Sequence, residues 1–261
     1  MRTSQTLLLL AGLLLSGSQP VFASSEKDIA KALANTERSA VDRERDARDK
    51  PQQVLELAGF KKGMLIADVF GGGGYYSEIL SSAVGKKGKV LLINNPQYDA
   101  FTKKFVTARL ADNRLPNVQY SVVPSESLGL TANSLDGALI IMSYHDLFYD
   151  DAEGGWPKID NVAFIDQIVA ALKPGGRFLI VDHSAKTDSG VSDSKALHRI
   201  DEQYTIAELK ARGLQWVGAI DVLRNKDDDR TKSVFDPAIK GKTDRFVHVY
   251  QKPENKPATH L

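Results

Sequence analysis

From residue 64 to residue 251 the sequence alternates apolar stretches with amphipathic ones, and this alternation restricts the fold more than any other feature. Short apolar stretches between turn residues are typical of buried strands, and the segments that separate them are long enough for helices. Strands that alternate with helices form a parallel sheet with helices on both faces, and right-handed crossovers make an α/β fold of this kind doubly wound. The sequence predicts strands over residues 64–70, 89–93, 118–123, 135–143, 177–182, 214–223 and 245–251, and helices over residues 75–84, 99–110, 162–172 and 202–212.

A run of glycines, from Gly71 to Gly74, directly follows the first predicted strand. Glycine has no Cβ atom, so the backbone can turn tightly and approach a ligand closely. The helix that follows begins with unpaired N–H groups and the positive end of its dipole. In an open α/β sheet, ligands bind in the crevice at the carboxyl ends of the strands. The loop therefore indicates a ligand crevice, but it fits a dinucleotide or a tight turn without a ligand as well.

Later landmarks resemble those of class I S-adenosylmethionine-dependent methyltransferases. The string LKPGGR at residues 172–177 stands where this family ends a helix and enters its fifth strand, and an apolar fourth strand begins near SLD at residues 134–136. The resemblance covers roughly residues 50–251. It implies a mostly parallel, seven-stranded Rossmann-like sheet whose last strand, residues 245–251, is antiparallel. It also implies S-adenosylmethionine (SAM) as the cofactor.

Longer strings resemble a bacterial group of exported methyltransferases more closely. This resemblance supplies a fold and a cofactor but no methyl acceptor. The strings are FGGGGYY at residues 70–76, YHDL at 144–147, DHSA at 182–185, HRID at 198–201 and KTDRF at 242–246.

The resemblance implies a cofactor site at the glycine loop and at the ends of the second and third strands. Many class I enzymes hold the ribose with an acid after strand two, where this chain has Asn94 and Asn95. An acid after strand three often meets the adenine amine, and Glu126 is the candidate here. Phe70 stands where many of these enzymes have a glycine. The residues expected to bind the cofactor are Asp68, Gly71, Gly72, Gly73, Gly74, Tyr76, Asn94, Asn95 and Glu126.

Two histidines follow the fourth and fifth predicted strands, beside the expected cofactor. Imidazole titrates near neutral pH, so His145 or His183 can take a proton from an acceptor. Each histidine is also compatible with a polar group that only closes a strand end. No ligand spacing requires a metal ion, although imidazole and carboxylate can bind one. The expected catalytic residues are His145, Tyr144, Asp146 and His183, and the expected substrate-binding residues are Arg199 and Asp182.

The N-terminal residues predict export. Arg2 precedes an apolar stretch at residues 7–15 that is too short to span a bilayer, which takes about 20 helical residues. Val21 and Ala23 suit a signal-peptidase site, so we expect cleavage after Ala23 and a periplasmic protein without a stable membrane anchor. The chain has no cysteine, which excludes a lipoprotein anchor and disulfides. The expected parts are a signal peptide at residues 1–23, a helical extension at 24–50, the methyltransferase-like domain at 51–251 and a polar tail at 252–261.

The charge balance gives no signal for nucleic acid. There are 34 basic and 33 acidic residues, and the net charge is +1. The expected partner is a small-molecule substrate, as the methyltransferase hypothesis implies. The sequence leaves the oligomeric state open. The long connection over residues 224–245 is expected to form a lid over the cleft.

Three functions are compatible with these features. The first is a SAM-dependent methyltransferase that acts on a small molecule. The second is an exported binding protein that keeps the fold without catalysis. The third is an NAD-dependent oxidoreductase, which is disfavoured because the glycine pattern, the asparagines after strand two and the KPGG turn at residues 173–176 fit a methyltransferase better.

Overall fold

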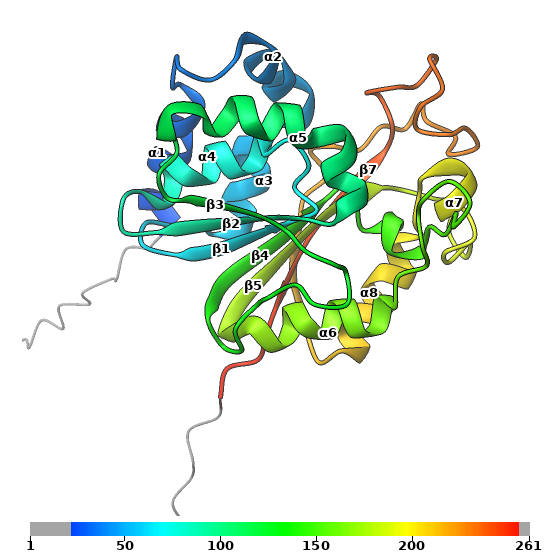
Figure 1. The fold of residues 1–261 in the computed structure, drawn as a ribbon. Coiled ribbons are helices and arrows are strands. Elements are labelled where there is room, and N and C mark those ends of the chain that lie inside the picture. The colour runs from blue at the N-terminus through cyan, green and yellow to red at the C-terminus, as the bar shows by residue number, and fades with distance from the viewer. Residues whose placement is uncertain (1–21, 256–261) are drawn as a thin grey trace, which may run out of the picture.

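The computed structural model describes residues 22–255 and contains one seven-stranded sheet (Figure 1). Residues 1–21 of the predicted signal peptide and residues 256–261 of the predicted tail lie outside the described residues. The strand order is β3-β2-β1-β4-β5-β7-β6. Strand β7 is antiparallel to β5 and to β6, and the remaining neighbours pair in parallel. The predicted fold class, including the antiparallel last strand, is confirmed.

The elements follow the alternation of the sequence closely. The strands are Leu65–Val69 (β1), Lys89–Asn94 (β2), Val118–Val122 (β3), Leu135–Ile141 (β4), Leu172–His183 (β5), Gln215–Ala219 (β6) and Arg245–Gln251 (β7). The α-helices are Phe22–Leu33 (α1), Ala40–Asp49 (α2), Pro51–Ala58 (α3), Tyr75–Val84 (α4), Pro96–Leu110 (α5), Asn161–Ala171 (α6), Ser194–Leu197 (α7) and Glu202–Ala211 (α8). Two 3-10 helices cover Ala111–Asn113 (η1) and His145–Phe148 (η2).

Both faces of the central strands are buried, as parallel strands require, whereas the edge strands β3 and β6 are largely exposed. Successive side chains of a strand point to opposite faces, and β5 shows the result. Leu179 and Val181 belong to an apolar cluster with α1, α3 and α4, whereas Phe178 and Ile180 belong to a second cluster with α6 and α8. Figure 1 shows helices on the two sides of the sheet. The carboxyl ends of β1, β2, β4 and β5 lie between these layers at one edge.

The N-terminal extension differs from its prediction. The sequence predicts one helix over residues 24–48, and the structure has two, α1 and α2, because the chain turns between them. The Ser39 hydroxyl accepts a hydrogen bond from the Asp42 N–H at 3.1 Å and starts α2. The Arg38 guanidinium donates to the carbonyl of Leu33 at 3.2 Å, at the end of α1. Helix α1 packs on α3 and α4, so the extension covers the domain.

The first or last residues of some helices and strands differ from the prediction, because local contacts determine where these elements begin and end. Helix α5 begins at Pro96 rather than residue 99, because the Asn95 side chain accepts from the Tyr98 N–H at 2.9 Å. Strand β5 begins at Leu172, which pairs with Leu135 of β4 ahead of a register shift. Strand β6 ends at residue 219, whereas the sequence predicts a strand to residue 223.

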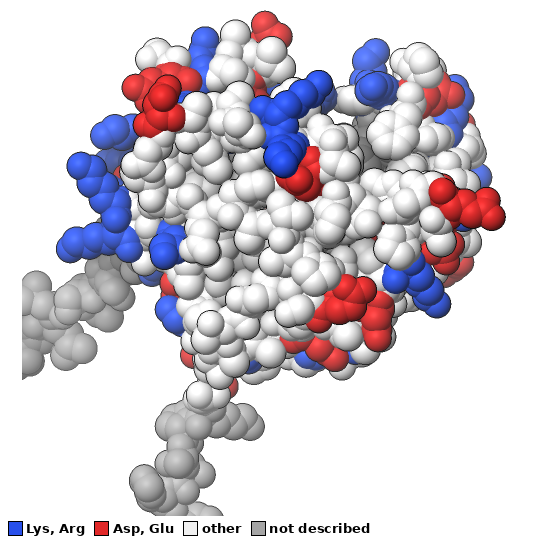
Figure 2. Space-filling model, viewed as in Figure 1, with Lys and Arg blue, Asp and Glu red and all other residues white. Residues whose placement is uncertain are grey.

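The surface agrees with the near-neutral charge. Acidic and basic side chains are interspersed on the face shown in Figure 2, with uncharged residues between them. Within residues 22–255, none of the helices combines the length and the apolar character needed to cross a bilayer.

Candidate functional site

A cavity of about 390 Å³ opens at the carboxyl ends of β4 and β5. Its volume lies in the range of small-molecule sites, and it lies where α/β sheets bind ligands. Five of its eleven lining residues are aromatic and two more are aliphatic, and three histidines and one carboxylate lie among them. The lining residues are Tyr98, Phe101, Met142, His145, Asp146, Tyr149, Trp156, His183, His198, Val234 and Phe235.

His145 is held by an aspartate from the neighbouring strand. Its Nδ1 lies 2.7 Å from Oδ1 of Asp182, and its backbone N–H donates to Oδ2 of the same carboxylate at 2.8 Å. His145 begins the 3-10 helix that follows β4, and Asp182 is the penultimate residue of β5. Pairing of β4 with β5 therefore brings the two together. Asp182 is fully buried, so it acts on His145 and does not line the cavity.

The Asp146 carboxylate contacts His145 and two rings on other elements, the imidazole of His198 and the phenol of Tyr98. Its Oδ1 lies 3.2 Å from Nε2 of His145 and 3.6 Å from Nδ1 of His198. Its Oδ2 accepts a hydrogen bond from the Tyr98 hydroxyl of α5. The His198 ring stacks on Tyr149, with centroids 5.2 Å apart.

The two carboxylates make this part of the cavity favourable for positive charge. Burial alone lowers the pKa of His145, but the charges of Asp146 and Asp182 outweigh it and raise this pKa to about 10. Burial raises the pKa of Asp146, and the neighbouring His145 outweighs it and holds this pKa well below its usual range. Burial and the adjacent Asp146 raise the pKa of Tyr98. Asp146 is therefore an anion at neutral pH.

His183 has the opposite electrostatics. Burial lowers its pKa well below the usual value, and repulsion by His145 and Arg245 lowers it further. Its Nδ1 lies 2.7 Å from the Thr243 hydroxyl. The other ring nitrogen has no hydrogen-bond partner among the residues the structure describes, and the side chain lines the cavity. His183 is therefore the neutral imidazole of the site.

Two residues expected in the site contact other parts of the protein. Tyr144 is fully buried, and its hydroxyl donates to Glu208 of α8 at 2.6 Å. Arg199 is fully buried and forms a two-point pair with Asp228, at 2.9 and 3.0 Å. Neither lines the cavity, so its expected contact with substrate has no support in this geometry.

The glycine loop packs closely against its own domain. A Cβ atom on Gly71 would lie 2.6 Å from both the Asp68 carboxylate and the Leu92 side chain, so any larger residue would displace these side chains. Gly72 donates its N–H to Oδ1 of Asn94 at 3.0 Å and accepts from Nδ2 of the same amide at 2.9 Å. Asn94 is fully buried, and its main polar contacts are thus with the loop.

The other loop residues expected at the cofactor also contact protein groups. Asp68 accepts a hydrogen bond from the Ser77 hydroxyl at 2.7 Å, and burial raises the pKa of Asp68 to about 6. Gly73 and Gly74 face α5, where a Cβ atom on Gly73 would lie 3.0 Å from Phe105. Tyr76 is buried.

Phe70 lies behind one lining residue of the cavity, Tyr98. Its ring stacks on Tyr98 with centroids 4.7 Å apart and packs on Phe164 of α6 at 5.0 Å. Its φ of 53° lies in the left-handed region, which favours glycine, the residue that the resemblance leads one to expect here. The departure seen in the sequence thus places an aromatic ring beside the crevice.

A smaller cavity of about 180 Å³ lies at the ends of β2 and β3. Asn95, Ser125 and Glu126 line it, which brings together two of the residues expected to bind the cofactor. Tyr149 and Trp156 line both this cavity and the larger one, so the two share a wall.

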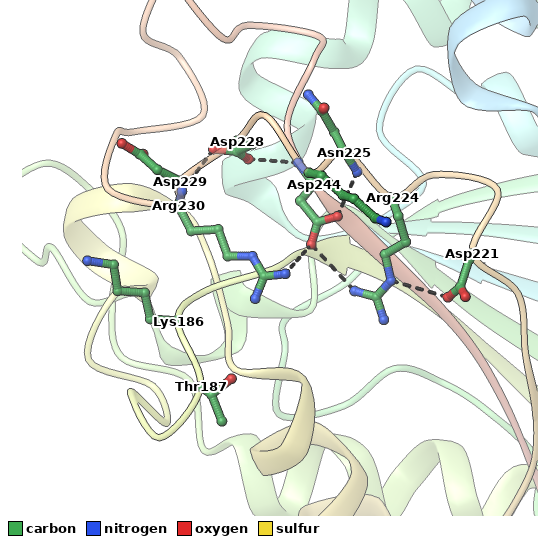
Figure 3. A pocket seen from close by; sticks show the side chains of 10 residues that line it. Lys186, Thr187, Asp221, Arg224, Asn225, Asp228, Asp229, Arg230 and Asp244 are labelled. Atoms are coloured by element: carbon green, nitrogen blue, oxygen red, sulfur yellow. Dashed lines mark hydrogen bonds and ion pairs between the residues drawn. The ribbon is translucent and has the colours of Figure 1, made fainter.

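The long connection between β6 and β7 closes one side of the larger cavity. Val234 and Phe235 line it, which agrees with the expected lid. Ion pairs hold the base of this connection, as Figure 3 shows, with Asp244 accepting from Arg224 and Arg230. These groups also line a charged surface pocket, separate in its lining from the aromatic cavity.

Sequence reasoning missed several lining residues. His198 stands in the string HRID, but only the left-handed backbone at φ 54° turns it toward Asp146. Tyr98 follows the asparagines after β2, and no sequence pattern marked it as a residue of the site. The aromatic residues Phe101, Tyr149, Trp156 and Phe235 are spread over three segments, so no local pattern joins them.

Comparison with known proteins supports the fold and gives a coarse relationship. No protein-family model matches the chain. The ubiquinone/menaquinone biosynthesis C-methyltransferase UbiE of Hydrogenovibrio crunogenus is 24% identical over 138 residues, 52% of this chain and 48% of the relative. The enzyme of the same name from Pseudomonas putida is 26% identical over 141 residues, 53% of this chain and 49% of the relative. The chain thus spans about half the length of these curated relatives.

Solved structures match over most of the chain. A SAM-dependent methyltransferase from Aquifex aeolicus is 20% identical, covers 87% of this chain and 98% of its own, and has a TM-score of 0.59. The [4+2]-cyclase SpnF is 17% identical, with coverages of 89% and 96% and a TM-score of 0.57. The chain has the class I methyltransferase fold. The cyclase shows that the fold does not by itself fix the reaction.

Proposed function

We propose that this protein is a SAM-dependent methyltransferase that acts on a small, mostly apolar acceptor. The observation that carries the proposal is the position of the two cavities. They lie side by side at the carboxyl ends of β2 to β5 and share Tyr149 and Trp156. The smaller one places the polar side chains of Asn95, Ser125 and Glu126 beside apolar residues, as a cofactor nucleoside needs. The larger one is lined by aromatic side chains and contains His183. The names of the curated relatives and of most structural neighbours agree with methyl transfer.

The residues present fit SAM at two points. Asn95, Ser125 and Glu126 offer the donors and acceptors that a ribose and an adenine need. The faces of Tyr98 and Trp156 suit the positive sulfonium, because aromatic faces attract cations. When bound, SAM supplies an electrophilic methyl group.

The chain's own groups would position the acceptor and take its proton. Orientation of two reactants can lower a barrier by about 7–11 kcal/mol, and the aromatic walls supply that orientation. His183 is neutral and faces the cavity, so it is placed to accept a proton from an acceptor hydroxyl or amine. His145 is held by two carboxylates and is the weaker candidate for the base.

The aromatic walls favour an acceptor with a planar, apolar ring. The aromatic side chains of Phe101, Tyr149, Trp156 and Phe235 line the cavity. The curated relatives are named for ubiquinone and menaquinone biosynthesis, which agrees with a ring acceptor. The chain matches only about half of the length of these relatives. A quinone precursor as the methyl acceptor is therefore a part of this proposal.

An exported binding protein without catalysis is the second candidate. One observation favours it: Asn94 is buried against Gly72, although the resemblance expects Asn94 or Asn95 at the cofactor ribose. A fold that had lost its cofactor would keep the aromatic cavity for another ligand.

Export to the periplasm is also proposed, on the sequence of residues 1–23. N-terminal sequencing of the protein from a periplasmic fraction tests it. A mature chain that starts at Ser24 is expected, and a chain that retains residues 1–23 in that fraction would contradict cleavage.

Calorimetric titration of the purified protein with SAM and with S-adenosylhomocysteine tests the function, with NAD as the control ligand. Micromolar binding of either methionine-derived ligand is expected, and Glu126→Ala should weaken it. Glu44→Ala is the matched control, because Glu44 is an exposed acid on α2. Absence of binding in a protein that circular dichroism shows to be folded would refute the methyltransferase and favour the binding protein. Binding of NAD alone would favour the oxidoreductase.

A further inference from the structure

Three potential metal ligands meet at one side of the aromatic cavity. One ligand atom from each of His145, Asp146 and His198 lies within 4.8 Å of the others. We propose that these three side chains bind a divalent transition-metal ion. This site is additional to the proposed methyl transfer and does not depend on it.

Two of the three distances between the ligand atoms are close to those of a metal site, and the third is at most 4.8 Å. Nitrogen and oxygen ligands lie about 2.0–2.2 Å from zinc in a tetrahedral site, so neighbouring ligand atoms are roughly 3.3 Å apart. Oδ1 of Asp146 lies 3.2 Å from Nε2 of His145 and 3.6 Å from Nδ1 of His198. The two nitrogens thus face the same carboxylate oxygen, and small side-chain movements would complete the site.

A second layer of hydrogen bonds orients the ligands. Asp182 contacts Nδ1 of His145, which leaves Nε2 directed at the proposed site. A carboxylate behind a histidine is the usual arrangement at protein metal sites. The Tyr98 hydroxyl binds Oδ2 of Asp146 and leaves Oδ1 for the ion.

The local charge favours a dication. The carboxylates of Asp146 and Asp182 flank His145, and the side chains of all three are at most 14% exposed. Paired buried carboxylates need a compensating positive charge, which a proton or a metal ion can supply. A metal ion at Nε2 of His145 would take the place of that proton.

His198 is held in an unfavourable backbone conformation. Its φ of 54° lies in the left-handed region, which is uncommon for residues other than glycine. Its ring is fixed between Tyr149 and Phe235, with centroid distances of 5.2 and 4.8 Å. This conformation ends α7, for which His198 is the C-cap residue, and it points the imidazole at Asp146.

The donor set limits the metal. Two imidazoles and one carboxylate suit zinc, iron, cobalt, nickel or manganese better than calcium or magnesium, which prefer oxygen ligands alone. The three protein ligands would leave positions open toward the cavity, where an oxygen of an acceptor or a water molecule can bind.

Titration of the metal-free full chain with Co²⁺ and Zn²⁺, without SAM, tests the site. One ion per chain is expected, and Co²⁺ should give visible absorption bands that Zn²⁺ abolishes by competition. Asp182→Asn should weaken binding by about 10- to 100-fold, as loss of an orienting carboxylate does elsewhere. His198→Gly and Asp146→Asn should weaken it further.

The variants are chosen so that a loss of folding is not mistaken for a loss of metal binding. Glycine adopts the left-handed conformation of residue 198 without strain, so His198→Gly removes the ligand and not the backbone geometry. Asp150→Asn is the matched control, because Asp150 is an exposed acid near the cavity and should bind metal like wild type. A folded wild-type chain that binds no ion, or a His198→Gly chain that binds it like wild type, would overturn the proposal. Neither result bears on SAM binding.

Discussion

Replacement of Asp228 by alanine should loosen the connection that closes the aromatic cavity. Asp228 is buried and accepts four hydrogen bonds. Two come from the guanidinium of Arg199, and two come from the backbone N–H groups of Arg230 and Asp244, at 3.0 and 2.7 Å. The variant therefore leaves a buried cation and two buried donors without their carboxylate.

The size of the effect follows from these contacts. Removal of one partner of a buried ion pair costs about 3–5 kcal/mol, because the remaining charge stays in a poorly solvated position. At about 2–4 °C per kcal/mol for a domain of this size, the melting temperature should fall by roughly 6–20 °C. Urea unfolding followed by circular dichroism gives the free energy, and differential scanning calorimetry gives the melting temperature.

Asp229→Ala is the control, since Asp229 is the exposed neighbour in sequence and its side chain contacts Thr231. Its unfolding midpoint should equal that of wild type within error. Equal midpoints for the Asp228 and Asp229 variants would refute the reasoning. Arg199 would then not depend on this pair, and its predicted contact with substrate would regain support.

Three further predictions concern the loop, the base and the response to acid. Gly71→Ala should lower the free energy of unfolding in urea by about 1–3 kcal/mol, because its Cβ atom would lie 2.6 Å from the Asp68 carboxylate. A variant as stable as wild type would contradict the close packing. His183→Ala should lower kcat about 10²- to 10⁴-fold and retain SAM binding. In the wild-type profile of kcat against pH, the acid limb should lie well below pH 6.5, because the pKa of His183 is lowered. An acid limb at or above pH 6.5 would exclude this base. Burial raises the pKa of Asp49, but the arginine partners of Asp49 outweigh burial and lower this pKa. Asp49 therefore stabilises the folded state above about pH 3.9, and this stabilisation is lost as the pH falls below that value. Asp49→Asn should therefore be less stable than wild type at pH 7 and lose less stability on acidification, and parallel pH curves in thermal unfolding would disprove this.

Strand and helix positions were largely predictable, because each depends on the apolar pattern of a short segment. The helix predicted over residues 162–172 forms over Asn161–Ala171, before the KPGG turn. The break between α1 and α2 was not predictable from hydrophobicity. It depends on a capping hydroxyl at Ser39 and a side-chain contact from Arg38.

The candidate site was predictable in its position but not in its contacts. The sequence placed His145 and His183 at the ends of neighbouring strands, and both line the aromatic cavity. It also suggested Arg199 for the substrate, whereas the fold buries that residue against Asp228. A charged residue in a loop gives no local sign of the partner it will meet.

The sequence by itself determined the doubly wound sheet and the glycine loop, since period, turn residues and element length are local properties of the chain. Only the tertiary structure decided that Asp182, 37 residues away, orients His145 while its neighbour Asp146 faces His198. The pairing register of β4 and β5 sets the first contact, and the left-handed turn at His198 sets the second. Both depend on how distant segments pack, which no local pattern records.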